Sequence, residues 1–300
     1  MSEWIIAIEG TEAGTRAALW LALLAAFLHA VFGALQKGQH DPWQVRGAID
    51  IWLVLLSAPV ALFIVPWPEG GQWFILLGAL CIHFVYKLGM ALAYSRAAFT
   101  VVYPVVRGTG PLFTVVGAYL IFGEVFTATQ WAGVALLSSA ILGLAVYNLA
   151  HVKVDRATLA PALWLALGTG AMVALYTTYD AYGIRATPDP FTFLAWFFFI
   201  TGMDFPLISY LHWRRDPHRP ALRPLMVRGI TGALVAFGSF GSIMLATRLD
   251  KVGEAAVLRE TSTVFAAFIG WLVLKEAVGP RRMALMMAIA CGAVIVELGG

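Results

Sequence analysis

The chain has 300 residues, of which 60% are apolar and only 12% are charged, and its formal net charge is +3. A soluble domain usually carries about 25% charged residues, so this composition excludes an ordinary soluble protein and favours lipid as the surrounding medium. The Lys and Arg residues gather in short polar breaks and form no basic stripe, which argues against a nucleic-acid partner.

Residues 1–15 form an N-terminal lead-in before the first apolar run. This segment contains Glu3, Glu9 and Glu12, and it lacks a basic region followed by an apolar core and a cleavage site. It is therefore not expected to be a cleavable signal peptide. We expect a short segment that lies at the membrane interface.

Apolar runs of the length that a spanning helix requires, about 20 residues, then follow one another to the C-terminus. Because a bilayer core offers no water to satisfy backbone polar groups, runs this long and continuous predict helices and not barrel strands. We therefore predict an all-α integral membrane protein. Its ten transmembrane helices are expected near residues 16–35, 46–65, 73–95, 99–122, 129–148, 161–183, 191–211, 224–247, 252–274 and 281–298.

The chain repeats itself at an offset that grows from 144 to 152 residues. Residues 18–23 recur word for word at 162–167, and Asp41-Pro42 matches Asp189-Pro190. At the largest offset, five residues have counterparts: Arg96, Arg107, Thr109, Phe113 and Glu124 match Arg248, Arg259, Thr261, Phe265 and Glu276. We predict a first repeat at 16–150, a linker at 151–160 and a second repeat at 161–300. Each repeat holds five helices, an odd number, so the second is expected to be inverted, a plan typical of secondary transporters.

The distribution of basic residues predicts the orientation in the membrane. The loops that follow odd-numbered helices hold most of the Lys and Arg, including Lys153, Arg156, Arg214 and Arg215. By the positive-inside rule, both termini are expected outside a bacterial-type inner (plasma) membrane.

The paired stretches around the fourth helix of each repeat resemble the drug/metabolite transporter superfamily in its EamA-like, ten-helix branch. They run from residue 93 through Gly110-Pro111 to Gly123-Glu124, and from 246 through Ser262-Thr263 to Lys275-Glu276. The resemblance covers nearly the whole chain and implies export of amino acids, sugars, nucleotide derivatives or other metabolites. It also implies structural roles for Glu124 and Glu276. The second copy departs from the pattern, because Thr263 replaces the proline found at Pro111.

Two arginines lie deep inside predicted helices. A charge at the centre of a spanning helix costs about 2.5–3.5 kcal/mol, and Arg107 and Arg259 are too far from the helix ends to snorkel easily. If the repeats are inverted, the two arginines approach the midplane from opposite sides and bracket an anionic group such as a carboxylate or phosphate. The alternative is that each arginine pairs with an interior acid or with helix-end carbonyls and holds the fold.

Other polar residues inside the runs are candidates for the same cavity. Lys87 and His83 share one face of the third helix, although Lys87 is near enough to the end to snorkel. His29 is either a cavity residue or a satisfied core residue. The remaining candidates offer a ring surface with a hydroxyl group, namely Tyr103, Tyr176 and Tyr179, with Tyr86 beside them.

The interior acids divide by position. Glu260 is expected to meet Arg107, Lys87 or a substrate ammonium group, and Asp204 lies beside Pro206, where a break in the helix is expected. Either acid is a candidate for a coupling proton. Three others lie nearer the helix ends and are read as caps or interface groups: Asp50, Asp180 and Glu254.

These features predict a secondary transporter, an exporter or exchanger, for a small anionic or zwitterionic metabolite, working as a monomer or homodimer with a coupling proton or a counter-substrate. A lipid flippase and a non-transporting subunit remain alternatives. A membrane-embedded enzyme is disfavoured, because no zinc, nucleophile-elbow or nucleotide-binding motif is present. No cofactor or metal is expected, and Cys81 and Cys291 are read as small buried hydrophobic residues.

Overall fold

The computed structural model describes residues 2–36, 41–96, 99–151, 156–217, 219–272 and 279–300, and all of its regular elements are helices. Two of the helices predicted from the sequence are each divided in two. The elements are α1 (Ser2–Ile8), α2 (Glu12–Gln36), α3 (Pro42–Phe63), α4 (Gln72–Tyr94), α5 (Phe99–Phe122), α6 (Ala128–His151), α7 (Arg156–Ala186), α8 (Pro190–Thr201), α9 (Pro206–Arg215), α10 (Leu222–Leu249), α11 (Val252–Arg259), α12 (Ser262–Leu272) and α13 (Pro280–Leu298).

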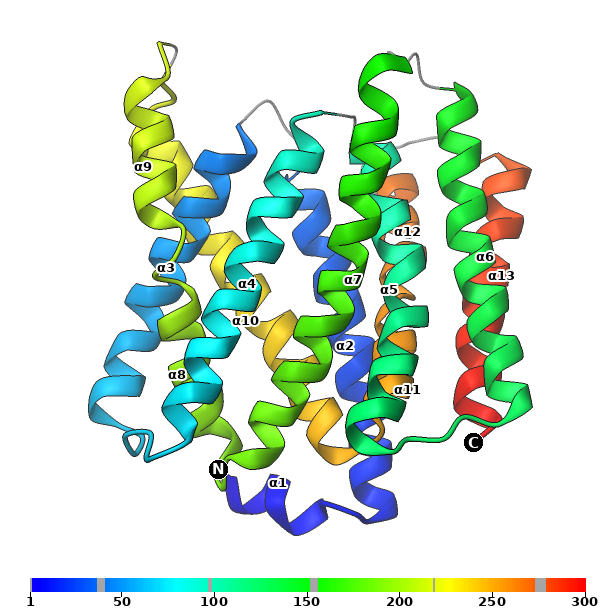
Figure 1. Cartoon of the computed structure of the whole chain (residues 1–300), viewed down its shortest axis with the longest axis horizontal. Helices are drawn as coiled ribbons and strands as arrows, with labels where there is room; N and C mark the ends of the chain where they lie inside the picture. The colour runs from blue at the N-terminus through cyan, green and yellow to red at the C-terminus, as the bar shows by residue number, and fades with distance from the viewer. Residues whose placement is uncertain (1, 37–40, 97–98, 152–155, 218, 273–278) are drawn as a thin grey trace.

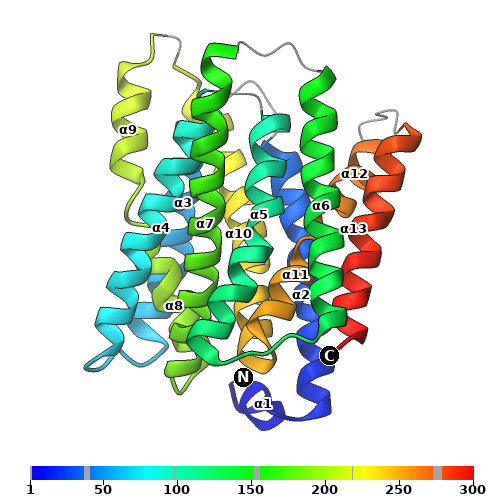
Figure 2. The same cartoon turned by 45° about the vertical axis from the view of Figure 1, so that its right-hand side comes forward.

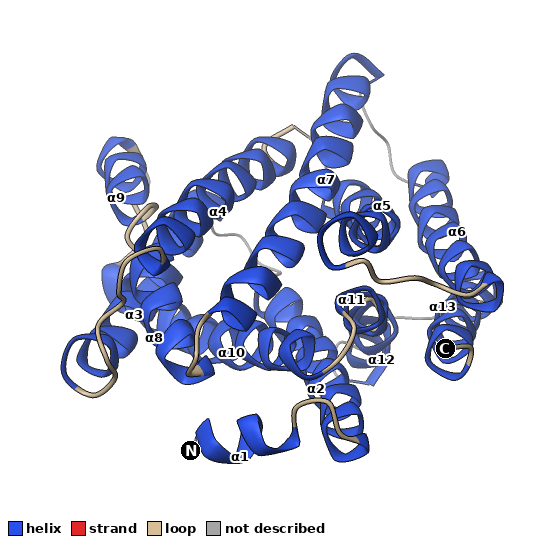
Figure 3. Cartoon of the chain, turned by 60° about the horizontal axis from the view of Figure 1, so that its bottom comes forward, coloured by secondary structure: helices blue, strands red, loops and turns tan. Residues whose placement is uncertain are grey.

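The helices from α2 onward run alternately up and down when α8 with α9 and α11 with α12 are each taken as one broken helix, and both termini lie at the same end of the bundle (Figure 1). Helix α1 lies across that end (Figure 1). Turning the molecule by 45° keeps α1 and the C-terminus at that end (Figure 2). Seen from that end, α6 and α13 lie side by side at one edge, and α3, α8 and α9 lie at the opposite edge (Figure 3). The middle of the bundle is formed by α2, α4, α5, α7, α10 and the pair α11 and α12.

Eight segments are long and apolar enough to cross a membrane, and they correspond to α2 to α7, to α8 taken together with α9, and to α10. The predicted class, an all-helical membrane protein, is therefore confirmed. The ninth and tenth predicted spans fall on α11 with α12 and on α13. The count of ten spans thus stays a prediction.

The break between α8 and α9 was expected at Asp204 and Pro206. Helix α8 ends at Thr201, and Pro206, which has no N–H to give, begins α9. The break between α11 and α12, at Glu260 and Thr261, was not expected, since residues 252–274 read as one continuous run. Both breaks leave helix-end carbonyls inside the protein that need partners.

The two Asp-Pro pairs of the sequence repeat have the same local structure. Asp41 is the N-cap of α3 and accepts a hydrogen bond from the Trp43 N–H, with Pro42 as the first helical residue. Asp189 is the N-cap of α8 and accepts from the N–H groups of Phe191 and Thr192. A side-chain oxygen at this position satisfies N–H groups that the helix leaves without partners.

The outer surface is apolar. Large side chains such as Phe63 (84% exposed), Trp20 (69%) and Trp164 (73%) point outward from the bundle, where a soluble protein would expose few such patches. Cys81 and Cys291 are also exposed on this surface, so the reading of both as buried residues was wrong. Helical runs flanked by lipid carry apolar residues on all faces, and apolar sequence alone does not separate lipid-facing from buried positions.

Candidate functional site

An interior cavity of about 90 Å³ lies among α2, α3, α4 and α5 and reaches α7 at Val173. The residues that line it come from the ends of these helices opposite the chain termini (Figure 1). The cavity is large enough for several water molecules. Its lining consists of His29, Phe32, Gly33, Pro42, Arg46, Tyr86, Lys87, Met90, Ala91, Tyr103, Val106, Arg107 and Val173.

The charged side chains in this lining are all cationic: Arg46, Lys87 and Arg107. Their carboxylate partners, Asp50, Asp204 and Glu260, do not line the cavity. The charged side chains of the cavity wall are therefore cations whose acidic partners lie outside the lining.

Arg107 is 3% exposed and reaches the break between α11 and α12. Its Nε lies 2.8 Å from Glu260 Oε2, although these two atoms are not aligned as a hydrogen bond. Its Nη2 donates to Ser262 Oγ at 3.1 Å and to the Arg259 carbonyl at 3.4 Å. The expected meeting of Glu260 with Arg107 is thus present, and the arginine ties α5 to a broken helix of the second half.

Arg259 is equally buried, at 3% exposure, but it is placed differently. Its Nη2 donates to Thr177 Oγ1 at 3.3 Å, its guanidinium carbon lies 6.0 Å from the Tyr176 ring centre, and its Nε has no hydrogen-bond partner. No carboxylate oxygen among the described residues lies within 4.0 Å of this guanidinium. Arg259 lines a separate small cavity of about 10 Å³ together with Tyr176 and Asp180.

Lys87 meets three oxygen atoms at the break between α8 and α9. Its Nζ donates to Asp50 Oδ2 at 2.9 Å, to Asp204 Oδ1 at 2.7 Å and to the Thr201 carbonyl at 2.6 Å. Asp50 also accepts two hydrogen bonds from Arg46, at 2.7 and 3.2 Å. The lysine side chain is only 3% exposed, so it does not snorkel to the membrane surface.

His83, one turn before Lys87, joins α4 to α7. Its Nε2 lies 2.8 Å from Asp180 Oδ2, and both side chains are nearly inaccessible. The other oxygen of Asp180 has no hydrogen-bond partner. His83 and Lys87 therefore share a helix face, as predicted, but the face meets carboxylates of both halves, Asp50 in the first and Asp180 and Asp204 in the second.

The remaining predicted site residues separate into two groups. His29 and Tyr103 line the interior cavity, and Tyr176 lies beside it, with its ring 4.8 Å from that of His83. Tyr179 does not line the cavity, because its ring contacts Tyr182 and its hydroxyl points toward the Phe74 carbonyl at the surface. Glu276 lies outside the described residues.

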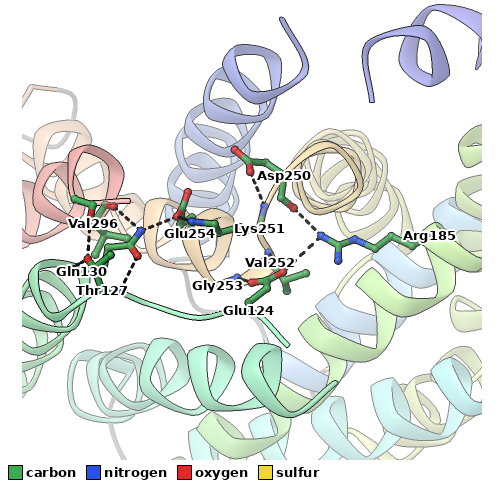
Figure 4. A network of polar contacts seen from close by, with 11 residues as sticks. Glu124, Thr127, Gln130, Arg185, Asp250, Lys251, Val252, Gly253, Glu254 and Val296 are labelled. Carbon is green, nitrogen blue, oxygen red and sulfur yellow. Dashed lines mark hydrogen bonds and ion pairs between the residues drawn. The ribbon is translucent and has the colours of Figure 1, made fainter. Parts of the chain in front are cut away.

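A polar network joins the helices at the end of the bundle that carries the termini (Figure 4). The Glu124 carboxylate accepts hydrogen bonds from the N–H groups of Val252 and Gly253 at 2.8 and 3.0 Å. Arg185 Nη2 donates to the Asp250 carbonyl at 2.7 Å and lies 3.6 Å from Glu124 Oε1. Glu124 was expected to have a structural role, and its carboxylate caps the N-terminus of α11.

The same network continues to α6 and α13. Gln130 donates to Glu254 Oε1 at 2.6 Å and to the Val296 carbonyl at 3.1 Å (Figure 4). Lys251 donates to Glu254 Oε1 at 2.7 Å, and this hydrogen bond raises the pKa of Lys251 above its ordinary value. Glu254 is thus an interface group near a helix end, as predicted.

Comparison with known proteins identifies the transporter class. Residues 160–298 match the model of the EamA-like transporter family. The match covers the second half of the chain. The resemblance predicted from the sequence is thereby confirmed for residues 160–298, and the match indicates a membrane transporter of the drug/metabolite type.

A solved structure of another protein has the same fold as this chain. A protein described only by its crystal structure superposes with a TM-score of 0.70 and 17% identity, covering 96% of this chain and 99% of its own. At this identity the likeness shows the fold alone. A search of curated proteins finds no match to the chain.

Two acids that the sequence analysis placed at helix ends are buried in ion pairs inside the bundle. Asp50 is fully buried and pairs with Arg46 and Lys87, and Asp180, 3% exposed, pairs with His83. The spacing of Arg46 and Asp50, four residues apart on one helix face, is the signal that identifies Asp50 as a paired acid. No comparable local signal marks Asp180, whose partner lies 97 residues away.

Proposed function

We propose that the chain carries a small anionic or zwitterionic metabolite across an inner membrane by alternating access, as ten spans in two inverted five-helix halves. The substrate binds in the interior cavity beside Arg107 and moves as an export or exchange substrate. The observation that carries this proposal is the charge of the cavity wall, whose charged residues are all cations. Arginine recognises carboxylate and phosphate groups through two parallel hydrogen bonds.

The direction of the helices supports the inverted arrangement. Helix α2 starts at the end that carries the termini, and α7, its counterpart in the sequence repeat, starts at the opposite end (Figure 1). The contacts between helices also match between the two halves. The first helix of each half packs against the third helix of the other half, as α2 does with α10 and α7 with α4. It also packs against the fourth helix of the other half, as α7 does with α5 and α2 with the pair α11 and α12. Transporters of this plan bind substrate near the interface between the repeats.

Arg107 and Arg259 have different roles in the proposed cycle. Arg107 faces the interior cavity, while Arg259 lies behind Tyr176 at the smaller cavity. Arg259 has no carboxylate oxygen within 4.0 Å among the described residues, so its guanidinium attracts an anion toward the interface between the halves when the bundle changes state. His29, Tyr86 and Tyr103 add hydrogen-bonding groups and ring surface beside Arg107.

Glu260 is the proposed coupling residue, with Asp204 as the second candidate. Glu260 is 1% exposed and shares the Arg107 guanidinium, so an anionic substrate that binds Arg107 competes with it. A carboxylate that loses its cationic partner in a dry interior gains a proton. Substrate binding and proton uptake are coupled through this exchange.

The test begins with a thermal-shift screen of the purified full chain against carboxylates, phosphate esters, amino acids and neutral analogues of the same size. A ligand that binds the folded protein raises the apparent Tm. Hits are then assayed for uptake and counterflow in proteoliposomes. Stabilisation by neutral analogues as strong as that by anions and zwitterions would contradict the proposal.

The decisive variant is the pair Arg107→Gln with Glu260→Gln, which removes both charges and leaves no buried acid alone. We expect the double variant to fold and to lose binding and transport of the hit. Arg282→Ala is the matched control, because Arg282 lies at the α6 and α13 edge, where it bonds to Asn148. Normal transport by the double variant would assign Arg107 a purely structural role.

The proposed orientation, with both termini outside, follows from the basic loops. It is tested by fusing reporters that work only outside or only inside the cell to the C-terminus. Cross-linking in proteoliposomes distinguishes a monomer from a homodimer.

A lipid or amphiphile flippase is the second candidate, and one groove favours it. An apolar groove of about 410 Å³ lies between α2, α12 and α13, lined by side chains such as Leu23, Phe265 and Val294, with Glu297 as its acidic member. Ala290→Trp would fill this groove and leave the interior cavity unchanged. Loss of labelled-lipid translocation in this variant supports a flippase, whereas unchanged metabolite transport supports the leading proposal.

A further inference from the structure

The surroundings of Lys87 form a cage of oxygen atoms that a free cation would also fill. Three oxygen atoms from three places in the chain converge on its Nζ at 2.6 to 2.9 Å: Asp50 in α3, the Thr201 carbonyl at the end of α8, and Asp204 in the break before α9. An ammonium group has three donors, so all three are used within the protein. Lys87 therefore has no donor left for a substrate, even though its stem lines the interior cavity.

The chemistry of this cage is that of a monovalent cation site. Carboxylates, together with a carbonyl at the C-terminal end of a broken helix, are the groups with which transporters coordinate coupling ions. A buried, unpartnered oxygen, Asp204 Oδ2, adds a further possible ligand. The ammonium group is also close in size to a potassium ion.

The charge balance explains why a cation must be present. Asp50 and Asp204 contribute two negative charges, and Arg46 and Lys87 contribute two positive charges. All but Arg46 are at most 4% exposed, and Arg46 is 24% exposed. Without Lys87 the cluster carries one net negative charge in a poorly hydrated interior, which is unfavourable.

We propose that the oxygen cage formed by Asp50, Thr201 and Asp204 is a monovalent-cation site, and that the Lys87 ammonium group permanently occupies it as a tethered cation. The chain thus carries its own substitute for a coupling sodium or potassium ion, and the cation fastens α4 and α3 to the α8–α9 break. Lys87 also lines the cavity of the proposed function, but the cage is formed by Asp50, Thr201 and Asp204, none of which lines that cavity.

The test removes the tether from the full chain. Lys87→Ala deletes the atoms of a propylammonium ion and leaves the three oxygens. Thermal unfolding is measured in detergent at equal concentrations of choline, sodium, potassium, ammonium and propylammonium chloride. We expect the natural chain to have one Tm in all five salts. The variant should show a saturable rise of a few degrees with potassium, ammonium or propylammonium over choline, because a ligand of the folded state stabilises it.

Two controls make the result specific to the cage. Adding Asp204→Asn to Lys87→Ala restores charge neutrality, so the cation response should disappear. Lys251→Ala removes a lysine that also pairs with a carboxylate, but Lys251 is 38% exposed and water can take its place, so no cation response is expected. Equal Tm values for Lys87→Ala in all five salts, or an undiminished response in the double variant, would overturn the proposal.

Folding of the single variant is itself informative. If Lys87→Ala is recovered folded only when potassium or propylammonium is present during purification, the cage binds a free cation. If it is never recovered while Lys87→Ala with Asp204→Asn folds, neutral charge suffices and a free cation does not replace the lysine, which overturns the proposal. Because thermal unfolding needs no transported substrate, this outcome is independent of whether the chain carries an anion.

Discussion

Arg107 and Arg259 occupy matching positions 152 residues apart and are both 3% exposed, but among the described residues only Arg107 has a carboxylate oxygen within 4.0 Å. The repeat in the sequence therefore places two guanidinium groups in the interior, and the single acid Glu260 makes their environments unequal. A buried charge with a partner and one without respond differently to removal.

The first prediction follows from this difference. Arg107→Met leaves Glu260 buried without its cation, and we expect a loss of about 3–5 kcal/mol in the free energy of unfolding. Arg259→Met leaves no acid without an ion-pair partner, so the free energy of unfolding should stay unchanged or increase slightly. Thermal and denaturant unfolding of both variants in one detergent measures the contrast. Equal losses would show that Arg259 has an ionic partner of its own.

Much of the fold was predictable from the length of the apolar runs in the sequence. Every predicted apolar run coincides with a helix or a broken helix, and Pro206 marked the α8–α9 break in advance. The break at Glu260 and Thr261 was not predicted, because no proline marks it and the Thr261-Ser262-Thr263 stretch, whose residue types are typical of a helix start, was read as part of one continuous apolar run. It is held instead by contacts from elsewhere, among them Arg107 to the Arg259 carbonyl.

The candidate site was predictable in its residue types but not in its pairings. Depth inside a helix identified Arg107 and Arg259, because lipid does not tolerate unpaired charges, and Lys87 was identified by the helix face that it shares with His83. Their partners come from distant segments, as Lys87 and Asp204 show at a separation of 117 residues. Periodicity within one helix contains no information about which helices become neighbours.

A second prediction concerns the contact between α6 and α13. A Cβ on Gly292 would lie 2.7 Å from the Gly133 carbonyl oxygen, and a Cβ on Gly133 would lie 2.7 Å from the Gly292 oxygen. Backbone atoms at this distance must move apart, so Gly292→Ala should cost about 1–3 kcal/mol. Unfolding of the purified variant measures the cost.

Gly168→Ala is the matched control for this contact. No heavy atom lies within 4 Å of the position that its Cβ would take, and alanine favours a helix over glycine by up to about 1 kcal/mol. We expect this variant to be at least as stable as the natural chain. If both variants lose the same stability, close approach of α6 and α13 is not the cause.

The third prediction concerns the N-cap of α8. Asp189→Ala removes the acceptor for the N–H groups of Phe191 and Thr192, and it should cost about 1 kcal/mol. Asp189→Asn retains an oxygen acceptor and should cost less. Unfolding curves of the three proteins under identical conditions check this order, and an asparagine variant as unstable as the alanine variant would contradict the cap.

Asp189 also predicts the direction in which the stability of the protein changes with pH. Partial burial raises the pKa of Asp189, but hydrogen bonds from Ser2, Thr192 and Phe191 outweigh it and hold the pKa below its ordinary value. A lowered pKa in the folded state stabilises the protein above the pKa of the unfolded state, and this contribution is lost as pH falls through the folded-state value. The stability difference between the natural chain and Asp189→Asn should therefore shrink in acid, below the ordinary range of an aspartate. A difference that grows in acid would contradict the assignment.

The last prediction concerns the closed end of the bundle. Glu124→Ala removes the acceptor for two N–H groups of α11 and the carboxylate that faces Arg185. Loss of a helix cap of this kind costs about 0.5–2 kcal/mol, and the cost falls only on the state in which this end is closed. The population with this end open should therefore increase.

A Met244→Cys reporter, at the small cavity beside Arg259, should react faster with a water-soluble maleimide in the Glu124→Ala protein. The background is Cys81→Ala with Cys291→Ala, and Glu124→Gln, which keeps an oxygen acceptor, serves as the control with a smaller increase. Unchanged labelling in Glu124→Ala would show that the network of Figure 4 fastens helices together without controlling access to the interior.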